Sequence, residues 1–159
     1  MPLDINLESG EVFISLPMPY QNIRITAARL SDVPAQTKMM NDPAIAMNFT
    51  GMPLPYSEHD AGGFIALLRA STYRVMNAYK EHTGDWTTFL GPDVPVHILR
   101  EIQPDGTDVF LGNVVLCRSA YKEVEDLQKR TRLANENLER RDGDPSIEWM
   151  FCSKPTPHK

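Results

Sequence analysis

A predicted β-hairpin between Val94 and Arg118 constrains this chain more than any other feature of its sequence. Two runs rich in aliphatic and β-branched residues, 94–102 and 109–117, flank the turn sequence Gln-Pro-Asp-Gly-Thr-Asp. Gly106 can adopt the positive φ that a tight reversal needs, so the pattern indicates a hairpin. The second run is almost continuously apolar, which predicts a strand covered on both faces by helices. We therefore expect this hairpin to form the centre of a sheet.

The length and charge of the chain limit its class. With 159 residues it corresponds to one domain, and a net charge of −5 without a basic stripe argues against nucleic-acid binding. The two cysteines, Cys117 and Cys152, have neither the spacing of metal ligands nor that of a disulfide framework. There is no apolar leader and no long apolar run, so we expect a cytoplasmic protein without a membrane segment.

Before the hairpin, the sequence predicts two strands and two helices. Residues 12–16 form a short strand-like piece, and 23–27 alternate between apolar and polar residues, as in a strand with one wet face. Ser31 is placed to cap a helix that runs to about Asn41. The Ser-Glu-His-Asp sequence at 57–60 has the pattern of a capping box, and the apolar residues behind it recur at helical spacing up to Tyr79.

After the hairpin, the sequence predicts one more helix and one more strand. Within 121–141 a narrow apolar stripe repeats at alternating intervals of three and four residues, formed by Val124, Leu127, Thr131, Ala134 and Leu138. Residues 146–152 read as a strand, and 153–159 have no capacity for regular structure. The order of these elements predicts an α+β (α/β) fold with a mixed, mainly antiparallel sheet flanked by helices.

The motifs of common catalytic and nucleotide sites are missing from the sequence, and we expect no metal site. Neither Gly-x-Ser-x-Gly nor a phosphate-binding glycine loop occurs. His97, inside a predicted strand, is expected to be a half-buried structural residue, or a base if it faces a cleft. Glu148 is the acidic residue of the last predicted strand. If buried it could serve as a general base, whereas a solvent-facing glutamate is the plain alternative.

Five segments together resemble the GNAT N-acetyltransferases, in particular the branch that acetylates the N-termini of ribosomal proteins. They lie in the family's order and span residues 23 to 150. The segments are Ile-Arg-Ile-Thr-Ala-Ala-Arg-Leu-Ser-Asp at 23–32, Asn-Asp-Pro-Ala-Ile at 41–45, Pro-Tyr-Ser-Glu-His-Asp-Ala with Phe-Ile at 55–65, Phe-Leu-Gly-Asn-Val-Val-Leu at 110–116 and Ile-Glu-Trp-Met at 147–150.

The resemblance implies a splayed sheet that binds acetyl-CoA between its fourth and fifth strands and transfers the acetyl group to an amine. The acceptor would be a small molecule or a protein N-terminus, bordered by the segment 47–56. The acceptor-side residues implied are Phe49, Met52 and Tyr56. The cofactor-binding residues implied are those of the fourth strand, Trp149, Met150, Phe151 and Cys152. Glu148 is the residue implied as the base that takes the proton of the amine.

The chain departs from the family after the predicted fourth strand. There the family has a glycine-rich loop that opens a helix and binds the cofactor pyrophosphate. Here the last glycine is Gly143, and 153–159 contain two prolines, which lack an N–H. We therefore expect a truncated domain: an N-terminal extension over 1–22, a GNAT-like portion over 23–152 and a disordered tail over 153–159.

Two functions stay open on the sequence alone. The first is a GNAT-like N-acetyltransferase that is weak or inactive unless a partner chain completes it. The second is a non-enzymatic binding protein derived from the acetyltransferase fold. In either case an exposed fourth strand would be an unpaired edge, which predicts a homodimer formed through that edge.

Overall fold

The computed structural model describes residues 3–47, 52–84, 93–121, 124–141, 144, 146 and 148–155, with the backbone alone at 116, 117 and 149–155. Its contacts divide the chain into two compact units. The first unit comprises residues 1–114 with 154–159, and the second comprises 115–153. Each unit is described by itself. The division expected from the sequence, at 22/23 and 152/153, stays a prediction.

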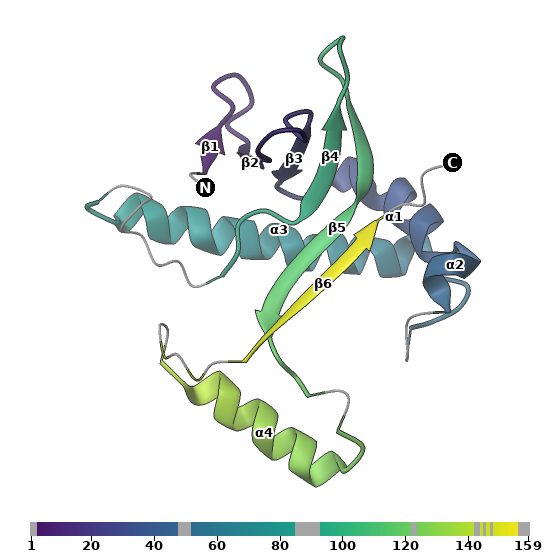
Figure 1. Ribbon diagram of the computed structural model, residues 1–159, viewed down its shortest axis with the longest axis vertical. Coiled ribbons are helices and arrows are strands. Elements are labelled where there is room, and N and C mark those ends of the chain that lie inside the picture. Colours follow the sequence, from purple (N-terminus) through teal and green to yellow (C-terminus); the bar gives the residue numbers. More distant parts are fainter. Residues whose placement is uncertain are drawn as a thin grey trace. The chain divides into compact units, whose positions relative to one another are not determined.

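The chain folds into an antiparallel sheet with helices, so the predicted α+β class is confirmed (Figure 1). The strands are β1 (Asp4–Ile5), β2 (Val12–Ser15), β3 (Ile23–Thr26), β4 (Ile98–Ile102), β5 (Asp108–Arg118) and β6 (Trp149–Pro155). The first five pair antiparallel in chain order, and β6 follows β5 in the strand order. The helices are the 3₁₀-helix η1 (Leu30–Asp32), α1 (Val33–Met40), α2 (Pro43–Ala46), α3 (Glu58–Glu81) and α4 (Leu127–Glu139).

The predicted hairpin is β4 and β5, and both strands have neighbours on each side in the strand order. Gly106 has a φ of 84°, as the reversal requires, and the Gln103 N–H donates to the Thr107 carbonyl at 2.8 Å. The register shifts between Leu99 and Arg100, and Gly112 opposite Leu99 has a φ of 148°. This β-bulge therefore accounts for a glycine within the apolar run of β5.

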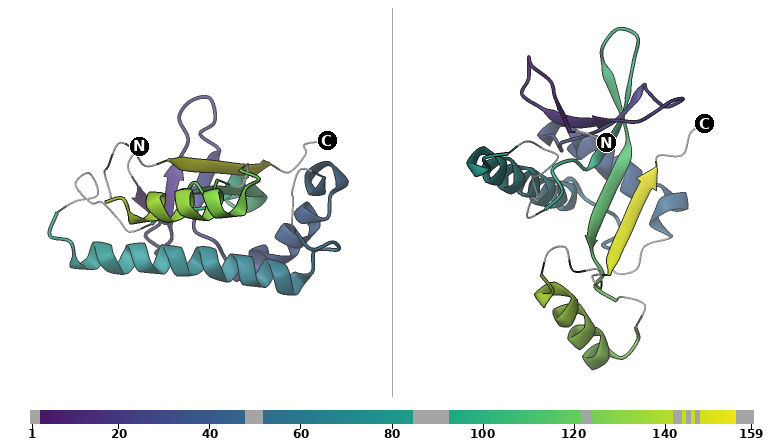
Figure 2. Two further views of the ribbon diagram at one scale, coloured as in Figure 1. Left: turned by 90° about the horizontal axis from the view of Figure 1, so that it is seen from below. Right: turned by 60° about the vertical axis from the view of Figure 1, so that its left-hand side comes forward.

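The two faces of the sheet differ in burial. Thr26, Ile98 and Asn113 share one face through their cross-strand register, and their side chains are essentially inaccessible. Helix α1 packs against α3 (Figure 2), and Gln36 of α1 contacts the Asn113 side chain on this face. On the other face, Ile14, Ile25 and Leu99 are only half-buried. Val109 is 46% exposed, so the prediction that β5 is covered on both faces is wrong at this residue.

Helix α3 begins as its sequence predicts. The Ser57 hydroxyl accepts from the Asp60 N–H, and the Asp60 carboxylate accepts from the Ser57 N–H, which confirms the capping box. A Cβ added to Gly62 or Gly63 would meet no atom within 4 Å. Close packing therefore does not explain this glycine pair, although a paired glycine in a helix usually suggests it.

The helix predicted over 31–41 begins differently. The segment forms two helices instead of one. The first is η1, whose N-cap is Arg29, and the second is α1, which starts at Val33 and has Asp32 as its N-cap. Ser31 is exposed and is not the cap. The reason is that the Asp32 carboxylate accepts from the Arg29 N–H at 2.7 Å and so organises the first turn itself. A short helix, α2, follows α1 and was not among the two helices predicted before the hairpin.

In the second unit, the elements keep their order but not their bounds. Helix α4 covers 127–139, a shorter range than the predicted 121–141, and Asp126 caps it by accepting from the Lys129 N–H at 2.9 Å. Strand β6 begins at Trp149, three residues later than expected. It continues to Pro155, so the expectation of irregular structure is wrong for 153–155, because a proline is compatible with an edge strand. Residues 156–159 lie outside the described part of the chain.

No helix in the described ranges combines the length and the apolar character that a membrane crossing requires.

Candidate functional site

The segment expected to border an acceptor is fixed to the end of α1 by one side chain. Asn41 donates from Nδ2 to the Tyr56 carbonyl at 2.7 Å and accepts at Oδ1 from the Tyr56 N–H at 2.9 Å. Both backbone groups of Tyr56 are therefore satisfied by a single amide. Asn41 was recognised in the sequence only as part of the Asn-Asp-Pro segment, and its function as a clamp explains why an asparagine stands there.

The acceptor-side residues occupy different environments. The side chain of Tyr56 is only 8% exposed and belongs to the core cluster, against which Met52 packs partly buried. The other buried members of the cluster are Met39, Met40, Ile45 and Ala61. Met52 and Tyr56 are thus brought together, whereas Phe49 lies outside the described residues. Burial, together with the nearby Asp60 carboxylate, raises the pKa of the Tyr56 hydroxyl above 10.0, while Gln36 acts in the opposite direction.

A buried pair of amides lies beside Tyr56 and was missed by sequence analysis. Asn113 of β5 donates from Nδ2 to the Gln36 Oε1 at 2.8 Å, and both side chains are fully buried. Gln36 Nε2 and Asn113 Oδ1 have no hydrogen-bond partner among the described residues. A donor and an acceptor left together in a core are costly unless a small polar molecule such as water joins them. The only signal in the sequence is an asparagine within the apolar run of β5.

An ionic cluster in the first unit fastens η1 to the sheet. The Arg100 Nη2 donates to both carboxylate oxygens of Asp32 at 2.8 Å, and its Nε donates to the Thr26 hydroxyl at 2.8 Å. Asp108 lies 3.4 Å from Arg100 Nη1 and also pairs with Arg29 at 2.7 Å. Because Arg100 and Asp32 are each 3% exposed at the side chain, the cluster is a structural element rather than an accessible site.

His97 lies just before β4 and is 2% exposed, which is more complete burial than expected. Neither ring nitrogen has a hydrogen-bond partner in the described part of the chain. Burial lowers the pKa of His97 below 6.5, although Asp93 acts in the opposite direction. The structural interpretation of His97 therefore fits its surroundings better than the interpretation as a base.

In the second unit, Glu148 lies one residue before β6 and its side chain is exposed. It is therefore outside the strand in which it was predicted to lie. The reason is that the Asn137 side chain engages its backbone. Asn137 Oδ1 accepts from the Glu148 N–H at 3.0 Å and Nδ2 donates to the Glu148 carbonyl at 2.8 Å. The Ser119 N–H also donates to this carbonyl, at 2.7 Å. The backbone of Glu148 is thus fixed while its carboxylate stays accessible.

Tyr121 is the neighbour of Glu148 that sequence analysis missed. Its side chain is 7% exposed, and its backbone has a φ of 50°, a conformation that is uncommon for a residue other than glycine. Desolvation raises the pKa of the Tyr121 hydroxyl above 10.0, and a hydrogen bond with the Glu148 side chain adds to this increase. The pair brings a phenol and an accessible carboxylate together at the base of β6.

The four residues expected to contact the cofactor form the first part of β6, and the backbone of Trp149 to Cys152 is extended. In the described ranges, no cluster of three histidine, cysteine or acidic side chains could hold a metal ion. Met52 and Tyr56 belong to the first unit, and Glu148 with the predicted cofactor residues Trp149 to Cys152 belongs to the second.

Comparison of this chain with family models, with curated proteins and with solved structures finds no match.

Proposed function

We propose that this chain is a GNAT-like N-acetyltransferase domain that uses acetyl-CoA and an amine acceptor, with weak activity unless a partner chain completes it. The observation that supports it is the order of elements: β3, η1 with α1, α2, α3, β4, β5 and β6, with the strands antiparallel in sequence order from β1 to β5. The proposal is also supported by the positions of the resembling segments among these elements. Segment 23–32 covers β3 and η1, 41–45 joins α1 to α2, 55–65 opens α3, 110–116 lies in β5 and 147–150 opens β6.

The proposed chemistry is direct attack of an amine nitrogen on the thioester carbonyl, which releases a thiol. The amine must lose a proton, and Glu148 is the proposed base because its carboxylate is exposed while its backbone is fixed by Asn137. In the absence of substrate, the protonated Tyr121 hydroxyl donates a hydrogen bond to this carboxylate. The N–H and C=O groups along β6 could hold the amide-bearing pantetheine arm, as a strand edge holds an added strand.

Isothermal titration of the chain with acetyl-CoA tests the proposal. We expect a dissociation constant in the micromolar range, corresponding to about −8 kcal/mol at 1 μM. An absence of heat at millimolar acetyl-CoA would exclude the proposal.

The role of Glu148 is tested separately by the release of free thiol in the presence of peptide amines. Glu148→Gln should reduce the transfer rate about 100-fold, at the low end of general-base effects, without changing acetyl-CoA affinity. Glu139→Gln is the matched control, because Glu139 is also exposed in the second unit and lies on α4. Equal rates for the two variants would dismiss Glu148 as the base.

A second candidate is a non-enzymatic binding protein that forms homodimers through β6. It is favoured by the position of β6 at the end of the strand order, since a terminal strand can pair with another chain. Light scattering combined with the same titration distinguishes the candidates. Dimers without acetyl-CoA binding would favour the second candidate, and a monomer at all concentrations would count against it.

A further inference from the structure

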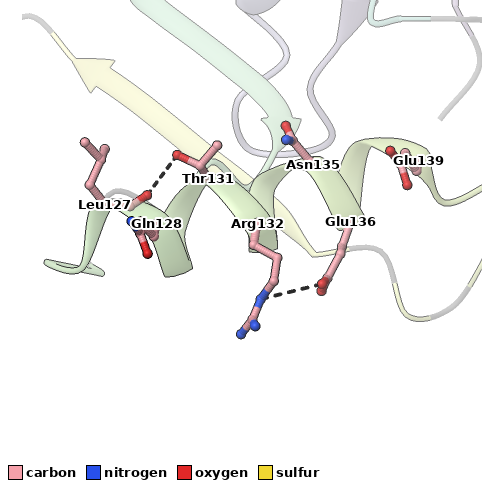
Figure 3. Close-up of a pocket in the computed structure, with 7 residues that line it drawn as sticks. All are labelled: Leu127, Gln128, Thr131, Arg132, Asn135, Glu136 and Glu139. Atoms are coloured by element: carbon pink, nitrogen blue, oxygen red, sulfur yellow. Dashed lines mark hydrogen bonds and ion pairs between the residues drawn. The ribbon is translucent and has the colours of Figure 1, made fainter.

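Helix α4 carries an apolar seam that its own unit leaves uncovered. Leu127, Thr131, Ala134 and Leu138 follow each other at intervals of four, three and four, which is the spacing of a coiled-coil contact face. Leu127 and Leu138 are 63% and 64% exposed. Figure 3 shows Leu127 and Thr131 on the same side of the helix. The stripe that the sequence predicted is therefore present, but it does not face the interior of the second unit.

The helix is nevertheless held firmly from another side. Arg118 Nη1 donates to the carbonyls of Asn137, Leu138 and Arg140 at 2.5, 3.2 and 2.8 Å and so caps the C-terminus of α4. The Asn137 side chain is fully buried and bonds to the Glu148 backbone. Residue 137 lies about 100° around the helix from residue 138. The anchoring contacts therefore leave the side chains of the seam available.

An open groove of about 620 Å³ runs beside the seam (Figure 3). Its lining residues all belong to α4: Leu127, Gln128, Thr131, Arg132, Asn135, Glu136 and Glu139. Because α4 supplies every lining residue in the described part of the chain, a ligand that fills the groove must itself supply the opposite wall. A second helix with matching side chains has the right shape for this.

The seam is complementary to itself in the antiparallel direction. If Leu127 contacts Leu138 of a second copy, Thr131 faces Ala134 of that copy, and the two-fold axis repeats both contacts. On one flank Gln128 then lies opposite Asn135, so two amides meet. The charged Arg132 and Glu136 pair within their own helix at 3.7 Å. The leucines therefore face each other, and the small side chains face each other, with the Thr131 hydroxyl already donating to the Leu127 carbonyl of its own helix at 2.8 Å.

We propose that this chain self-associates through α4, which packs antiparallel against α4 of a second copy. The contact is short, since a 13-residue helix is about 20 Å long. The surface buried between two such helices is therefore smaller than the roughly 1,200–2,000 Å² that stable complexes bury. The association is accordingly weak and reversible. The inference does not depend on acetyl-CoA binding, and it uses a different surface from the β6 edge.

Sedimentation velocity on the full chain tests the proposal, from about 10 μM to about 1 mM, the range in which weak complexes dissociate. The double variants Leu127→Glu with Leu138→Glu, and Leu127→Lys with Leu138→Lys, each place like charges across the interface. We expect each alone to weaken association at least tenfold, and an equimolar mixture of the two to restore it. Leu67→Glu on α3 is the control, because Leu67 is 69% exposed and lies in the first unit. It should leave association unchanged.

Disulfide trapping tests the register. Leu127→Cys and Leu138→Cys are prepared separately, each with Cys117→Ser and Cys152→Ser, and then mixed under oxidation. A cross-link between residues 127 and 138 is expected in the mixture. A 127–127 cross-link from the first variant alone would overturn the antiparallel arrangement, because the two copies of residue 127 would lie about 16 Å apart along the helix axis in it, beyond the reach of a disulfide. A chain that stays monomeric to about 1 mM, or associates equally well with both charged variants, overturns the proposal. A lower melting temperature of the monomeric charged variants also overturns it, because the seam would then be covered by the same chain.

Discussion

Loss of the Asp32 charge should destabilise the fold more than loss of any accessible carboxylate. Arg100 is 3% exposed at its side chain, and Asp32 supplies two acceptors at 2.8 Å. Removing one partner of a buried ion pair typically costs about 3–5 kcal/mol, because the other charge stays buried without compensation. In Asp32→Asn the amide oxygen keeps one acceptor, and Asp108 at 3.4 Å from Arg100 compensates part of the charge. The expected cost is therefore at the lower end, about 3 kcal/mol.

Urea unfolding followed by far-ultraviolet circular dichroism measures this cost. A loss of about 3 kcal/mol is a large share of the usual stability of about 5–15 kcal/mol, and it corresponds to a melting temperature lower by roughly 6–12 °C for a chain of this size. Asp108→Asn is the control, because its carboxylate is 21% exposed and its loss should cost about 1 kcal/mol or less.

Strong energetic coupling is also expected between Asp32 and Arg100. Asp32→Leu combined with Arg100→Met removes both charges, so the pair of changes should cost much less than the sum of the single changes. Additive costs, or an Asp32→Asn variant within about 1 kcal/mol of the unmodified chain, would show that the ion pair does not hold η1 to the sheet.

Two further predictions concern stability. Gly63→Ala should stabilise α3 by up to about 1 kcal/mol, because Gly63 is exposed in a helix and an added Cβ meets nothing within 4 Å; a destabilised variant in urea unfolding would contradict this. Burial lowers the pKa of His97 in the folded state below its ordinary value of 6.5. The free energy of unfolding should therefore be unaffected by His97 above pH 6.5, and should decrease as the pH falls from 6.5 toward the lower pKa of the folded state. His97→Phe should flatten this part of the stability profile, and an unchanged acid-side slope would assign the loss to other groups.

Local signals were sufficient to predict the hairpin and α3. The turn at Gly106 and the capping box at Ser57 are each encoded within a few residues, and both were confirmed. The contacts missed by sequence analysis join distant residues. Gln36 and Asn113 are separated by 77 positions, and Asp32 and Arg100 by 68. Whether a polar residue is buried with a partner depends on the register of β3 to β5, which no local pattern fixes.

The start of β6 was misjudged for a related reason. The apolar pattern at 146–152 gives no indication that a side chain from α4 engages the Glu148 backbone. Asn137 takes the place of a strand neighbour there by offering one donor and one acceptor to the same residue. The regular strand therefore begins only at Trp149, directly after the glutamate, and the glutamate side chain is exposed.

Asn137 links the two proposals made for the second unit, and this gives a prediction that separates them. It fixes the backbone of the proposed base, and it anchors the helix that carries the seam. Asn137→Ala should therefore accelerate amide hydrogen exchange over 119–148 and reduce both acetyl transfer and self-association. Glu148→Gln should reduce transfer alone, and the charged variants at Leu127 and Leu138 should reduce association alone. If Asn137→Ala changed neither exchange nor association, the anchoring role of this side chain would be refuted, whatever the outcome for catalysis.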